Sequence, residues 1–518
     1  MIKLKIDHIE ILVPDGTSVL KAAGKAKIVI PTMCFNETVS SHASCMVCAV
    51  KNNISGEFIP SCEVKVQDGM ELLSNSPEVI EFRKDALELL LSDHLGDCEA
   101  PCRNTCPAFM DIPQMNRLIA NGDFSKALEV VKEEISLPLI LGYICSAPCE
   151  KACRRKQMEG AVSICQLKKF VALEDYKVDR AYFPEKLFIK NQKIGLIGTG
   201  MAGLSAAFHL MKYGYSCTLF DKNEQAGGML FQLAEKELPG QILKAEIETL
   251  KHLGAEFRLN TRVVAEQIRN DFDAIIIATG ESSKEPGIEF NAGDFSTSLQ
   301  GIFACGSVVS PVKMAVKVVA QGKAAANSVH RFLSGNTPEN GRKRFNSRFG
   351  KLNEAEIAEY LKESKAGERN EPATGYPAGF NREEAIAEAK RCLRCDCRKS
   401  GTCKLRTHSD KYCANQQKYK FGKRKSVRKY FQNEVLVYEP EKCIKCGLCI
   451  EIVGKQKKLT GLAYVGRGFD IFIGIPFCKS MQQAIADLAG DCIRTCPTGA
   501  LSSYTGEDGL KLMSNEIN

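Results

Sequence analysis

The sequence contains no tryptophan, only 7 histidines, and no apolar run of the ~20 residues that a membrane-spanning helix needs. We therefore expect no membrane span and a cytoplasmic location. The N-terminal MIKLKIDHIEILV alternates like an amphipathic strand and is not a signal peptide. No Ser–His–Asp or metal-hydrolase constellation is present, so the sequence gives no support for hydrolysis.

Cysteine, in contrast, is abundant: the chain has 24, mostly in tight clusters. Disulfide scaffolds are usually short and secreted, whereas a long soluble chain with C-x2-C and C-x3-C groups uses its thiolates as metal ligands. With so few histidines nearby, iron–sulfur centres are favoured over zinc or haem. A length of 518 residues with 44% hydrophobic content predicts several domains, of α/β and α+β class.

Residues 1–88 are expected to form a [2Fe–2S] domain. Four cysteines occur in the spacing C-x10-C-x2-C-x13-C: Cys34, Cys45, Cys48 and Cys62. Four thiolates are the ligand set of a [2Fe–2S] centre, and zinc is the alternative. With IPTMC at the first cysteine, the segment resembles the N-terminal ferredoxin domain of the large iron–sulfur subunit of respiratory NADH dehydrogenase and its hydrogenase and formate dehydrogenase relatives. The resemblance implies a β-grasp fold.

Residues 89–185 are expected to form a helical domain, because MNRLIANGDFSKALEVVKEEI spaces its apolar residues three and four apart. Cysteines lie on both sides of this stretch: Cys98, Cys102, Cys106, Cys145, Cys149 and Cys153, with Cys165 beyond. DCEAPCRNTCPAFMDIP, GYICSAPCEKACRR and AVSICQLKKFVALED resemble the N-terminal domain of the glutamate synthase small subunit. That resemblance implies two [4Fe–4S] clusters. Their eighth ligand stays open, since Lys168 stands where relatives carry Glu or Gln.

Residues 186–335 are expected to form a Rossmann-like FAD domain. KIGLIGTGMAGLSAAFHLMKYGYSCTLFDKNEQAGGML predicts a strand, a glycine turn, a helix and a second strand. The glycines allow a pyrophosphate to approach a helix N-terminus, and an acid after the second strand can bind a ribose hydroxyl. These residues are Gly198, Gly200, Gly203 and Asp221, followed by Gly227 and Gly228. A vestigial nucleotide fold, kept only as scaffold, is the alternative.

The rest of this domain keeps the order of the glutamate synthase family, with DAIIIATG ending at Gly280 and GIFACGSVV carrying Gly306 and Ser307. In the family the last position is an acid that binds the ribityl chain of FAD; a serine hydroxyl can still hydrogen-bond there. The family also inserts an NADPH domain between these motifs. Here only residues 281–300 intervene, far fewer than a βαβ domain needs, so we expect no separate NAD(P)H site.

Residues 336–380 are polar and glycine-rich and are predicted to be a linker, and residues 381–435 a cysteine-rich segment. Its cysteines are expected to hold a [4Fe–4S] cluster, with zinc as the alternative and Cys413 in reserve: Cys392, Cys395, Cys397 and Cys403. A basic stretch with a single acid, Asp410, runs from Arg398 to Lys429. It is either a solvated loop or a docking surface for an acidic partner.

Residues 436–518 are predicted to be a bacterial-type ferredoxin module with one of the two usual [4Fe–4S] clusters. The retained ligands are Cys443, Cys446, Cys449 and Cys496. The second centre would need cysteines where Val453, Ala486 and Ala489 stand, so it is lost. Cys478 and Cys492 are then expected to be buried thiols, as are Cys217 and Cys305. CIKCGLC and CPTGAL again resemble the NADH dehydrogenase large subunit and its relatives.

Together these modules predict FAD, one [2Fe–2S] and about four [4Fe–4S] clusters in an oxidoreductase. We expect an electron-transfer subunit of a hetero-oligomeric hydrogenase, formate dehydrogenase or transhydrogenase complex. It would relay electrons between a diaphorase-like NAD(P)H subunit and another redox subunit or ferredoxin. Nucleic acid is not an expected partner. The alternatives are a self-contained FAD reductase that uses ferredoxin electrons on a small substrate, and a scaffold without flavin.

Overall fold

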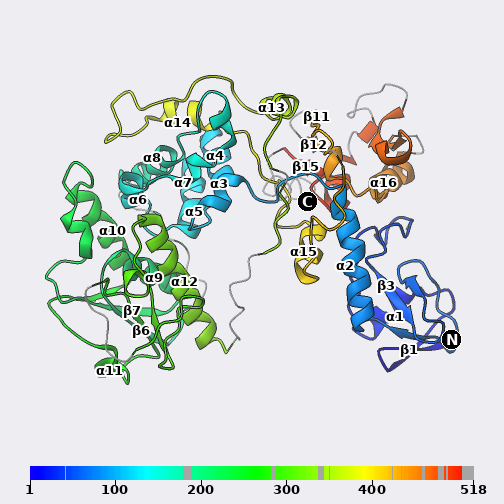
Figure 1. Ribbon diagram of the computed structural model, residues 1–518, viewed down its shortest axis with the longest axis horizontal. Coiled ribbons are helices and arrows are strands. Elements are labelled where there is room, and N and C mark those ends of the chain that lie inside the picture. Colours follow the sequence, from blue (N-terminus) through cyan, green and yellow to red (C-terminus); the bar gives the residue numbers. More distant parts are fainter. Residues whose placement is uncertain are drawn as a thin grey trace. The chain divides into compact units, whose positions relative to one another are not determined.

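The computed structural model (Figure 1) describes residues 1–40, 42–178, 182, 184, 189–281, 288–335, 344–348, 350–422, 424–432, 435–457, 461–476, 484–485 and 488–504. The chain divides into two compact units. Unit 1 consists of Met1–Glu99, Arg344–Lys362 and Cys395–Asn518, and unit 2 of Ala100–Lys343 and Glu363–Arg394. Both segments of unit 2 are thus inserted between segments of unit 1 in the sequence. Among the described residues, no helix is both long and apolar enough to cross a membrane.

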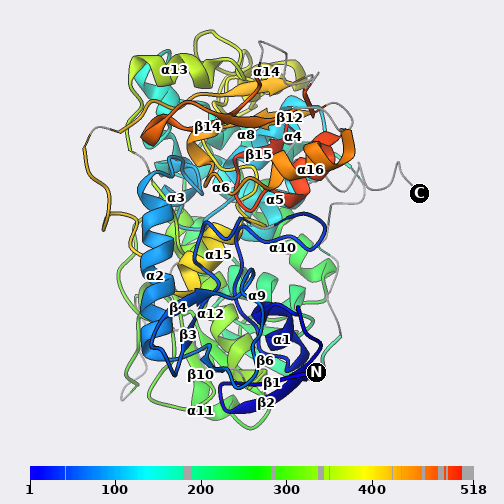
Figure 2. The same cartoon turned by 90° about the vertical axis from the view of Figure 1, so that its right-hand side faces the viewer.

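The N-terminal part of unit 1 is a five-stranded mixed sheet in the order β2-β1-β5-β3-β4. Its elements are β1 (Ile2–Ile6), β2 (Ile9–Val13), α1 (Val19–Lys25), β3 (Ala49–Asn52), β4 (Phe58–Pro60), β5 (Glu71–Leu73) and α2 (Pro77–Ser92). The alternation in β1 turns Leu4 and Ile6 inward, where they pack in one core with Val19 of α1. Figure 2 shows this sheet and α1 beside the N-terminus. The predicted β-grasp fold is confirmed.

The C-terminal part of unit 1 is built from short elements. They are α13 (Glu354–Leu361), α15 (Lys404–Lys411), β11 (Tyr430–Gln432), β12 (Leu436–Tyr438), η4 (Pro440–Lys442), α16 (Leu448–Lys457), β13 (Ala463–Val465), η5 (Gly468–Asp470), β14 (Phe472–Gly474), α18 (Ala489–Thr495) and β15 (Leu501–Ser503). β12 is the centre of an antiparallel β11-β12-β15 sheet, and β13 pairs with β14. Val453 and Cys492, at two positions of the lost second cluster, are fully buried in the apolar core between α16 and α18.

Part of the basic stretch from Arg398 to Lys429 is buried, and several of its exposed cations form ion pairs within unit 1. Lys399 is buried, and its Nζ donates to the carbonyl oxygens of Ile493 at 2.8 Å and Cys496 at 2.7 Å. Arg406 is also buried and forms an ion pair of 2.6 Å with Glu99. Others in the stretch pair with acids elsewhere in unit 1: Lys418 with Asp85, Arg424 with Glu356, Lys425 with Asp93 and Arg428 with Glu441. Because most of the acids that pair with these cations lie in other segments of the sequence, the ion pairs connect the stretch to other parts of unit 1.

Unit 2 begins with helices that carry cysteines. They are α3 (Pro101–Thr105), α4 (Ile112–Ala120), α5 (Phe124–Glu134), α6 (Pro138–Ile144), α7 (Pro148–Lys151), η1 (Arg154–Gln157) and α8 (Ile164–Tyr176), joined later by α14 (Arg382–Ala389). The predicted helical periodicity corresponds to α4 and α5, which are separated by a turn at Gly122 with a φ of 83°. Their apolar faces pack with α6 and α8 in one core.

The remainder of unit 2 is a parallel sheet in the order β10-β9-β6-β7-β8. Its elements are β6 (Lys193–Ile197), α9 (Met201–Lys212), β7 (Ser216–Phe220), η2 (Gly228–Gln232), α10 (Gly240–His252), β8 (Glu256–Arg258), α11 (Ala265–Ile268), β9 (Ala274–Ile277), β10 (Ile302–Ala304), η3 (Gly306–Val308) and α12 (Ala315–Leu333). Helices α9 and α12 lie side by side (Figure 1). The chain reverses its direction of winding at β6, and ligands of such sheets bind at the carboxyl end of that strand.

Candidate iron–sulfur and dinucleotide sites

The four N-terminal cysteines come together beside the β-grasp sheet. Cys34, Cys45 and Cys48 lie on the loop before β3, and Cys62 follows β4; all four are buried. The Sγ atoms of Cys34 and Cys45 are 3.4 Å apart. A hydrogen bond from Cys45 lowers the pKa of Cys34 to about 2, and a bond with Cys62 lowers that of Cys48 to about 6. Two thiolates are therefore favoured, and the donor set fits a four-cysteine [2Fe–2S] centre.

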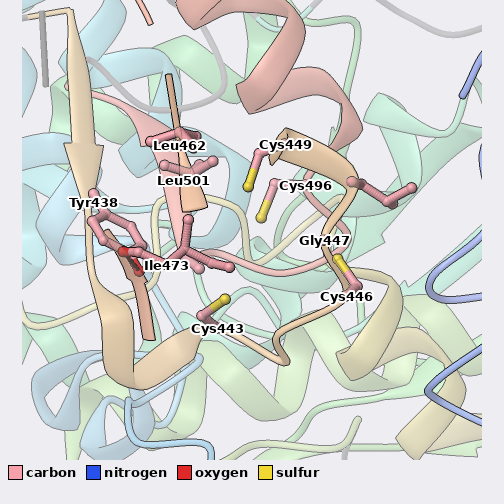
Figure 3. A pocket seen from close by; sticks show the side chains of 11 residues that line it. Tyr438, Cys443, Cys446, Gly447, Cys449, Leu462, Ile473, Cys496 and Leu501 are labelled. Carbon is pink, nitrogen blue, oxygen red and sulfur yellow. Dashed lines mark hydrogen bonds between the residues drawn. The ribbon is translucent and has the colours of Figure 1, made fainter. Parts of the chain in front are cut away.

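The second group lines a cavity in the C-terminal part of unit 1. Figure 3 shows the sulfurs of Cys443, Cys446, Cys449 and Cys496 directed at one space, which is closed by apolar residues such as Leu462. This cavity contains about 430 Å³ of space, open solvent included. Four converging thiols in an apolar shell fit a [4Fe–4S] cluster. The structure thus brings together the set that the C-x2-C-x2-C motif predicted.

The loop that carries these thiols has two residues in the left-handed region. Lys445 has a φ of 57° and Gly447 a φ of 77°. This path lets the backbone N–H of Lys445 donate to Cys443 Sγ at 3.3 Å. The positive φ of Gly447 favours glycine, and a Cβ there would lie 2.7 Å from the hydroxyl of Tyr464, which would have to move. The backbone is therefore shaped to direct N–H groups at sulfur, as cluster-binding loops require.

The cysteines of residues 381–435 fall on both sides of the boundary between the two units. Cys392 belongs to unit 2, where its thiol neighbours that of Cys153. Cys397 and Cys403 belong to unit 1, where they neighbour each other and Cys98. Cys395, also in unit 1, is half-buried, and the reserve ligand Cys413 is exposed. The structure therefore joins three cysteines that the sequence pattern assigned to two different sites.

A third complete group of thiols lies between α6, α7 and α8 of unit 2. The Cys149 thiol neighbours Cys106 and Cys145, and Cys165 donates a hydrogen bond to Cys145. That bond lowers the pKa of Cys145 to about 5 and raises the pKa of Cys165. The group so formed, Cys106, Cys145, Cys149 and Cys165, fits a [4Fe–4S] cluster.

Cys165, whose role the sequence left open, thus joins this group, whereas Lys168 turns to another partner and the eighth ligand stays open. Lys168 Nζ donates to the Leu141 carbonyl oxygen at 3.0 Å, and Cys165 Sγ lies 3.5 Å from the same oxygen. Burial alone would lower the pKa of Lys168, but the surrounding thiols raise it. The helical spacing of three residues between Cys165 and Lys168, which places both on one face of α8, is the signal that could have identified the cysteine.

Three further thiols lie at the edge of the unit 2 core: Cys102, Cys153 and Cys392 are half-buried and pack against it. Within the described residues, no three His, Cys, Asp or Glu side chains are close enough to hold a single metal ion. A zinc ion with bonds of about 2.3 Å would draw four sulfurs to about 3.8 Å from one another. A cluster has several irons and sulfides between its ligands and therefore needs wider groups.

The glycine turn after β6 has the shape that a dinucleotide requires. Gly198 has a φ of 107°, and a Cβ there would lie 2.4 Å from the carbonyl oxygen of Ala278. A Cβ on Gly203 would lie 2.0 Å from the carbonyl oxygen of Gly198. A Cβ on Gly200, in contrast, would meet no atom within 4 Å. Two of the glycines therefore allow close packing of α9, and the third leaves open space at the helix N-terminus, where a pyrophosphate binds.

Asp221 follows β7 and lies next to this turn. Its Oδ2 accepts hydrogen bonds from Thr199 N at 2.9 Å and Thr199 Oγ1 at 2.5 Å, and its Oδ1 accepts from Asn223. The buried carboxylate is thereby held in place, and a carboxylate has lone pairs left for ribose hydroxyls. Gly228 also lies next to the glycine turn, since a Cβ on Gly228 would be 3.1 Å from the Cα of Gly200. Gly227 precedes it with a φ of 138°.

The last predicted flavin residues lie at the ends of β9 and β10, which are parallel neighbours. Gly280 and Gly306 each have a φ of 79°, and a Cβ on Gly306 would lie 2.9 Å from Ala202 Cβ in α9. Ser307 is half-buried in η3. Between the two strands, the described residues 281 and 288–300 contain two isolated bridges, Phe290 with Thr297 and Ser296 with Phe303. The described part of this connection is a short loop.

Comparison with known protein families agrees with this architecture. Residues 1–77 match a 2Fe-2S iron-sulfur cluster binding domain, and residues 94–180 match dihydropyrimidine dehydrogenase domain II, 4Fe-4S cluster. Residues 196–256 match an NAD(P)-binding Rossmann-like domain. The predicted domain types and the multidomain fold class are confirmed. The chain is a multidomain iron–sulfur protein with domains of both cluster types and a Rossmann-like dinucleotide domain.

The relatives are subunits of oxidoreductases. The chain is 37% identical over 209 residues to the NADP(+)-dependent formate dehydrogenase subunit beta of Moorella thermoacetica, covering 35% of this chain and 29% of the relative. It is 30% identical over 210 residues to the NADPH-Fe(3+) oxidoreductase subunit beta of Geobacter sulfurreducens, covering 39% of this chain and 31% of the relative. It is 31% identical over 197 residues to the glutamate synthase [NADPH] small chain of Mycobacterium tuberculosis, covering 36% of this chain and 40% of the relative. The resemblance to the glutamate synthase small subunit is confirmed, and the chain spans less than half of each relative.

Proposed function

We propose that this chain is an electron-transfer subunit of a multi-subunit oxidoreductase. The observation that carries this proposal is one hydrophobic core in unit 1 that contains thiols from three groups: Cys34, Cys45, Cys403 and Cys446. Within it, Cys446 neighbours Cys34, and Cys403 neighbours Cys496 of the C-terminal cavity. A protein that used its clusters only as structural staples would have no reason to pack three of them side by side.

The donor sets support the predicted inventory of one [2Fe–2S] and about four [4Fe–4S] centres. Bound clusters would supply one-electron transfer, and a bound flavin would exchange one electron with clusters or two with a hydride donor. The residues of this chain bury the thiols, direct backbone N–H groups at sulfur and limit solvent access, which together set reduction potentials. We retain the segments 1–88, 89–185, 186–335, 336–380, 381–435 and 436–518 as proposed modules.

For the dinucleotide we propose FAD. The glycine turn, Asp221 and the resemblance to the glutamate synthase small subunit support a dinucleotide here. The connection between β9 and β10 is too short to hold a second dinucleotide domain, and the clusters need a neighbour that accepts single electrons. A flavin fits that need, whereas a nicotinamide exchanges a hydride.

The names of the relatives support a place in a complex. Subunits beta of an NADP(+)-dependent formate dehydrogenase and of an NADPH-Fe(3+) oxidoreductase are both matched. We propose a diaphorase-like NAD(P)H subunit as one partner and a second redox subunit or ferredoxin as the other, in the cytoplasm. Within such a complex this chain would join a two-electron donor to one-electron acceptors.

The test is the cofactor content of anaerobically purified full-length chain. We expect about 18 iron atoms and one FAD per chain, reduced by dithionite but not directly by NADH or NADPH. Iron near that value without flavin would overturn the flavin assignment. Rapid bleaching by NADPH alone would instead favour a self-contained reductase with its own nicotinamide site. Absence of iron would overturn the proposal as a whole.

A further inference from the structure

Three buried cysteines of unit 1 come from distant parts of the sequence. Cys98 ends the first segment of the unit, and Cys397 and Cys403 open its last segment, 299 positions later. All three side chains are less than 10% exposed, at 8%, 8% and 5%. The whole of unit 2 lies between Cys98 and Cys397 in the chain. Local spacing alone would group Cys98 with the C-x-x-x-C cysteines that follow it, and Cys397 and Cys403 with the C-x-x-C pair that begins at Cys392.

Backbone hydrogen bonds fix their positions relative to one another. The N–H of Cys397 donates to the Cys98 carbonyl oxygen at 3.2 Å, and the N–H of Cys98 donates to the Ser347 carbonyl oxygen at 3.1 Å. On the other side, Arg406 Nε donates to the Phe345 carbonyl oxygen at 3.0 Å, beside the ion pair of Arg406 with Glu99. All three segments of unit 1 thus meet at these cysteines.

Two of the sulfur atoms also receive hydrogen bonds from the backbone. The N–H of Ser347 donates to Cys98 Sγ at 3.4 Å, and the N–H of Arg406 donates to Cys403 Sγ at 3.5 Å. Hydrogen bonds of this direction stabilise the thiolate, which is the form that binds metal.

Buried thiols without a metal role behave differently in the same protein. Cys217 Sγ donates to the Ala207 carbonyl oxygen at 3.9 Å, as a neutral S–H does. Burial raises the thiol pKa at Cys305 just as it does at Cys98 and Cys403, so only the hydrogen bonds distinguish the two kinds of thiol. The contrast separates thiols that accept hydrogen bonds from thiols that only fill space. Cys98 and Cys403 belong to the first kind.

We propose that Cys98, Cys397 and Cys403 bind one iron–sulfur cluster of unit 1, whose ligand set is divided in the sequence by the insertion of unit 2. This deepens the proposed function, on which its iron–sulfur nature rests. Two contacts place the cluster next to the C-terminal cavity. Cys403 neighbours Cys496, and a Cβ on Gly499 would lie 2.2 Å from Cys397 Sγ. Cys392 then serves a separate cluster in unit 2, with Cys153.

The test uses single alanine variants of the full-length chain at Cys98, Cys397, Cys403 and Cys392, with Cys305→Ala as the matched control. Iron content and the electron paramagnetic resonance spectrum of the dithionite-reduced protein are recorded for each. We expect the first three variants each to lose about four iron atoms and the same spectral signal. Cys392→Ala should lose a different signal, and Cys305→Ala should keep them all.

A double variant guards against general loss of structure. If Cys98 and Cys397 share a cluster, the Cys98→Ala, Cys397→Ala double variant loses no more iron than either single variant. If they serve different clusters, it loses about eight atoms. Loss of one common signal in Cys392→Ala and Cys397→Ala, with that signal intact in Cys98→Ala, would overturn the proposal. So would zinc in place of iron at this position. Wild-type protein without any iron would instead contradict the proposed function.

Discussion

Unit 1 and unit 2 bury their cysteines in different ways. Unit 2 has a large core that joins the helices α4, α5, α6 and α8 to the parallel sheet, with four thiols inside it and four at its edge. A second, smaller core around Ile197, Phe220 and Ile275 contains no cysteine among the described residues. The interior of unit 1 is divided into smaller cores, and its thiols are members of them: Cys48 and Cys62 in one, Cys34, Cys45, Cys403 and Cys446 in the next, and Cys492 in the third.

This difference has an energetic consequence. Apolar side chains gain stability from burial alone, whereas buried thiols that must become thiolates are costly until a metal neutralises them. Binding free energy at such a site is therefore also folding free energy. We expect unit 1 to depend on its clusters for its fold and unit 2 to retain a folded sheet without them.

Removing iron gives the largest expected effect. After anaerobic treatment with a chelator, amide hydrogen exchange should become fast in β1, α2 and β12 of unit 1. The strands β6 and β9 and helix α9 of unit 2 should stay protected, because their core is apolar. Mass spectrometry of peptides measures both regions in one sample, and reconstitution with iron and sulfide is the control. Equal loss of protection in both units would remove the distinction between them.

A single ligand tests the same idea within unit 1. Cys449→Ala should remove one cluster, with about four iron atoms, and raise the protease sensitivity of the C-terminal part. Cys492 is the matched control, because it is fully buried nearby in the core of α16 and α18 but lies outside the cavity lining. Cys492→Ala should retain all iron and lose only the stability of a small cavity. Iron loss in the control would mean that the cavity does not define the ligand set.

In unit 2 the corresponding test is made on glycines. Gly203→Ala should lower the free energy of unfolding by roughly 3 kcal/mol or more, since its Cβ would meet the Gly198 carbonyl oxygen and the backbone has little room to move. Gly200→Ala should leave the apo-protein as stable as wild type but weaken FAD binding, because its Cβ points into open space. Thermal unfolding with and without FAD separates the two. Equal Tm values for both variants would contradict the expectation.

The smallest expected effect is a pH dependence of unit 2 that involves no cluster. Glu246 on α10 is buried and accepts a hydrogen bond of 2.6 Å from Leu139 N, and burial raises its pKa from 4.5 to about 7. Between these values the folded protein keeps a proton that the unfolded chain has lost. The contribution to stability is therefore present below pH 4.5, falls as the pH rises to 7, and is constant above it.

The total change should be at most about 3 kcal/mol. Urea unfolding of unit 2 between pH 5 and pH 8 measures it, and Glu246→Gln should flatten the profile. Glu248→Gln, on the exposed side of the same helix, is the matched control. An unchanged profile in Glu246→Gln would show that the carboxyl is already ionised in the folded protein.

Local patterns were sufficient for much of this protein. The alternation of β1, the strand–glycine–helix unit around Gly198 and the C-x2-C-x2-C loop each depend on neighbours within a few residues, and their geometry follows from spacing alone. The β-grasp, helical iron–sulfur and Rossmann-like domain types were predicted and are confirmed. The sets that end in Cys62 and Cys496 are brought together as the motifs indicated, and the assignment of clusters to them stays a prediction.

Other features could not be derived from neighbours in the sequence. Cys165 was left unassigned because its role depends on how α8 packs against α6. The basic stretch was interpreted as a solvated loop or a docking surface because the acids it pairs with, among them Asp85, Glu99 and Glu356, are distant in the chain. Cys478, expected to be buried, lies outside the described residues.

The sequence by itself thus determined which cofactors the chain is suited to and which local turns present them. Only the tertiary structure decided that Cys98 belongs with Cys397 and Cys403. The spacing of cysteines along a loop predicts a ligand set only when the ligands lie within a few residues of one another in the sequence. When an entire unit is inserted between two ligands, their partnership is set by backbone hydrogen bonds and burial among segments far apart in the chain, and no local pattern contains that information.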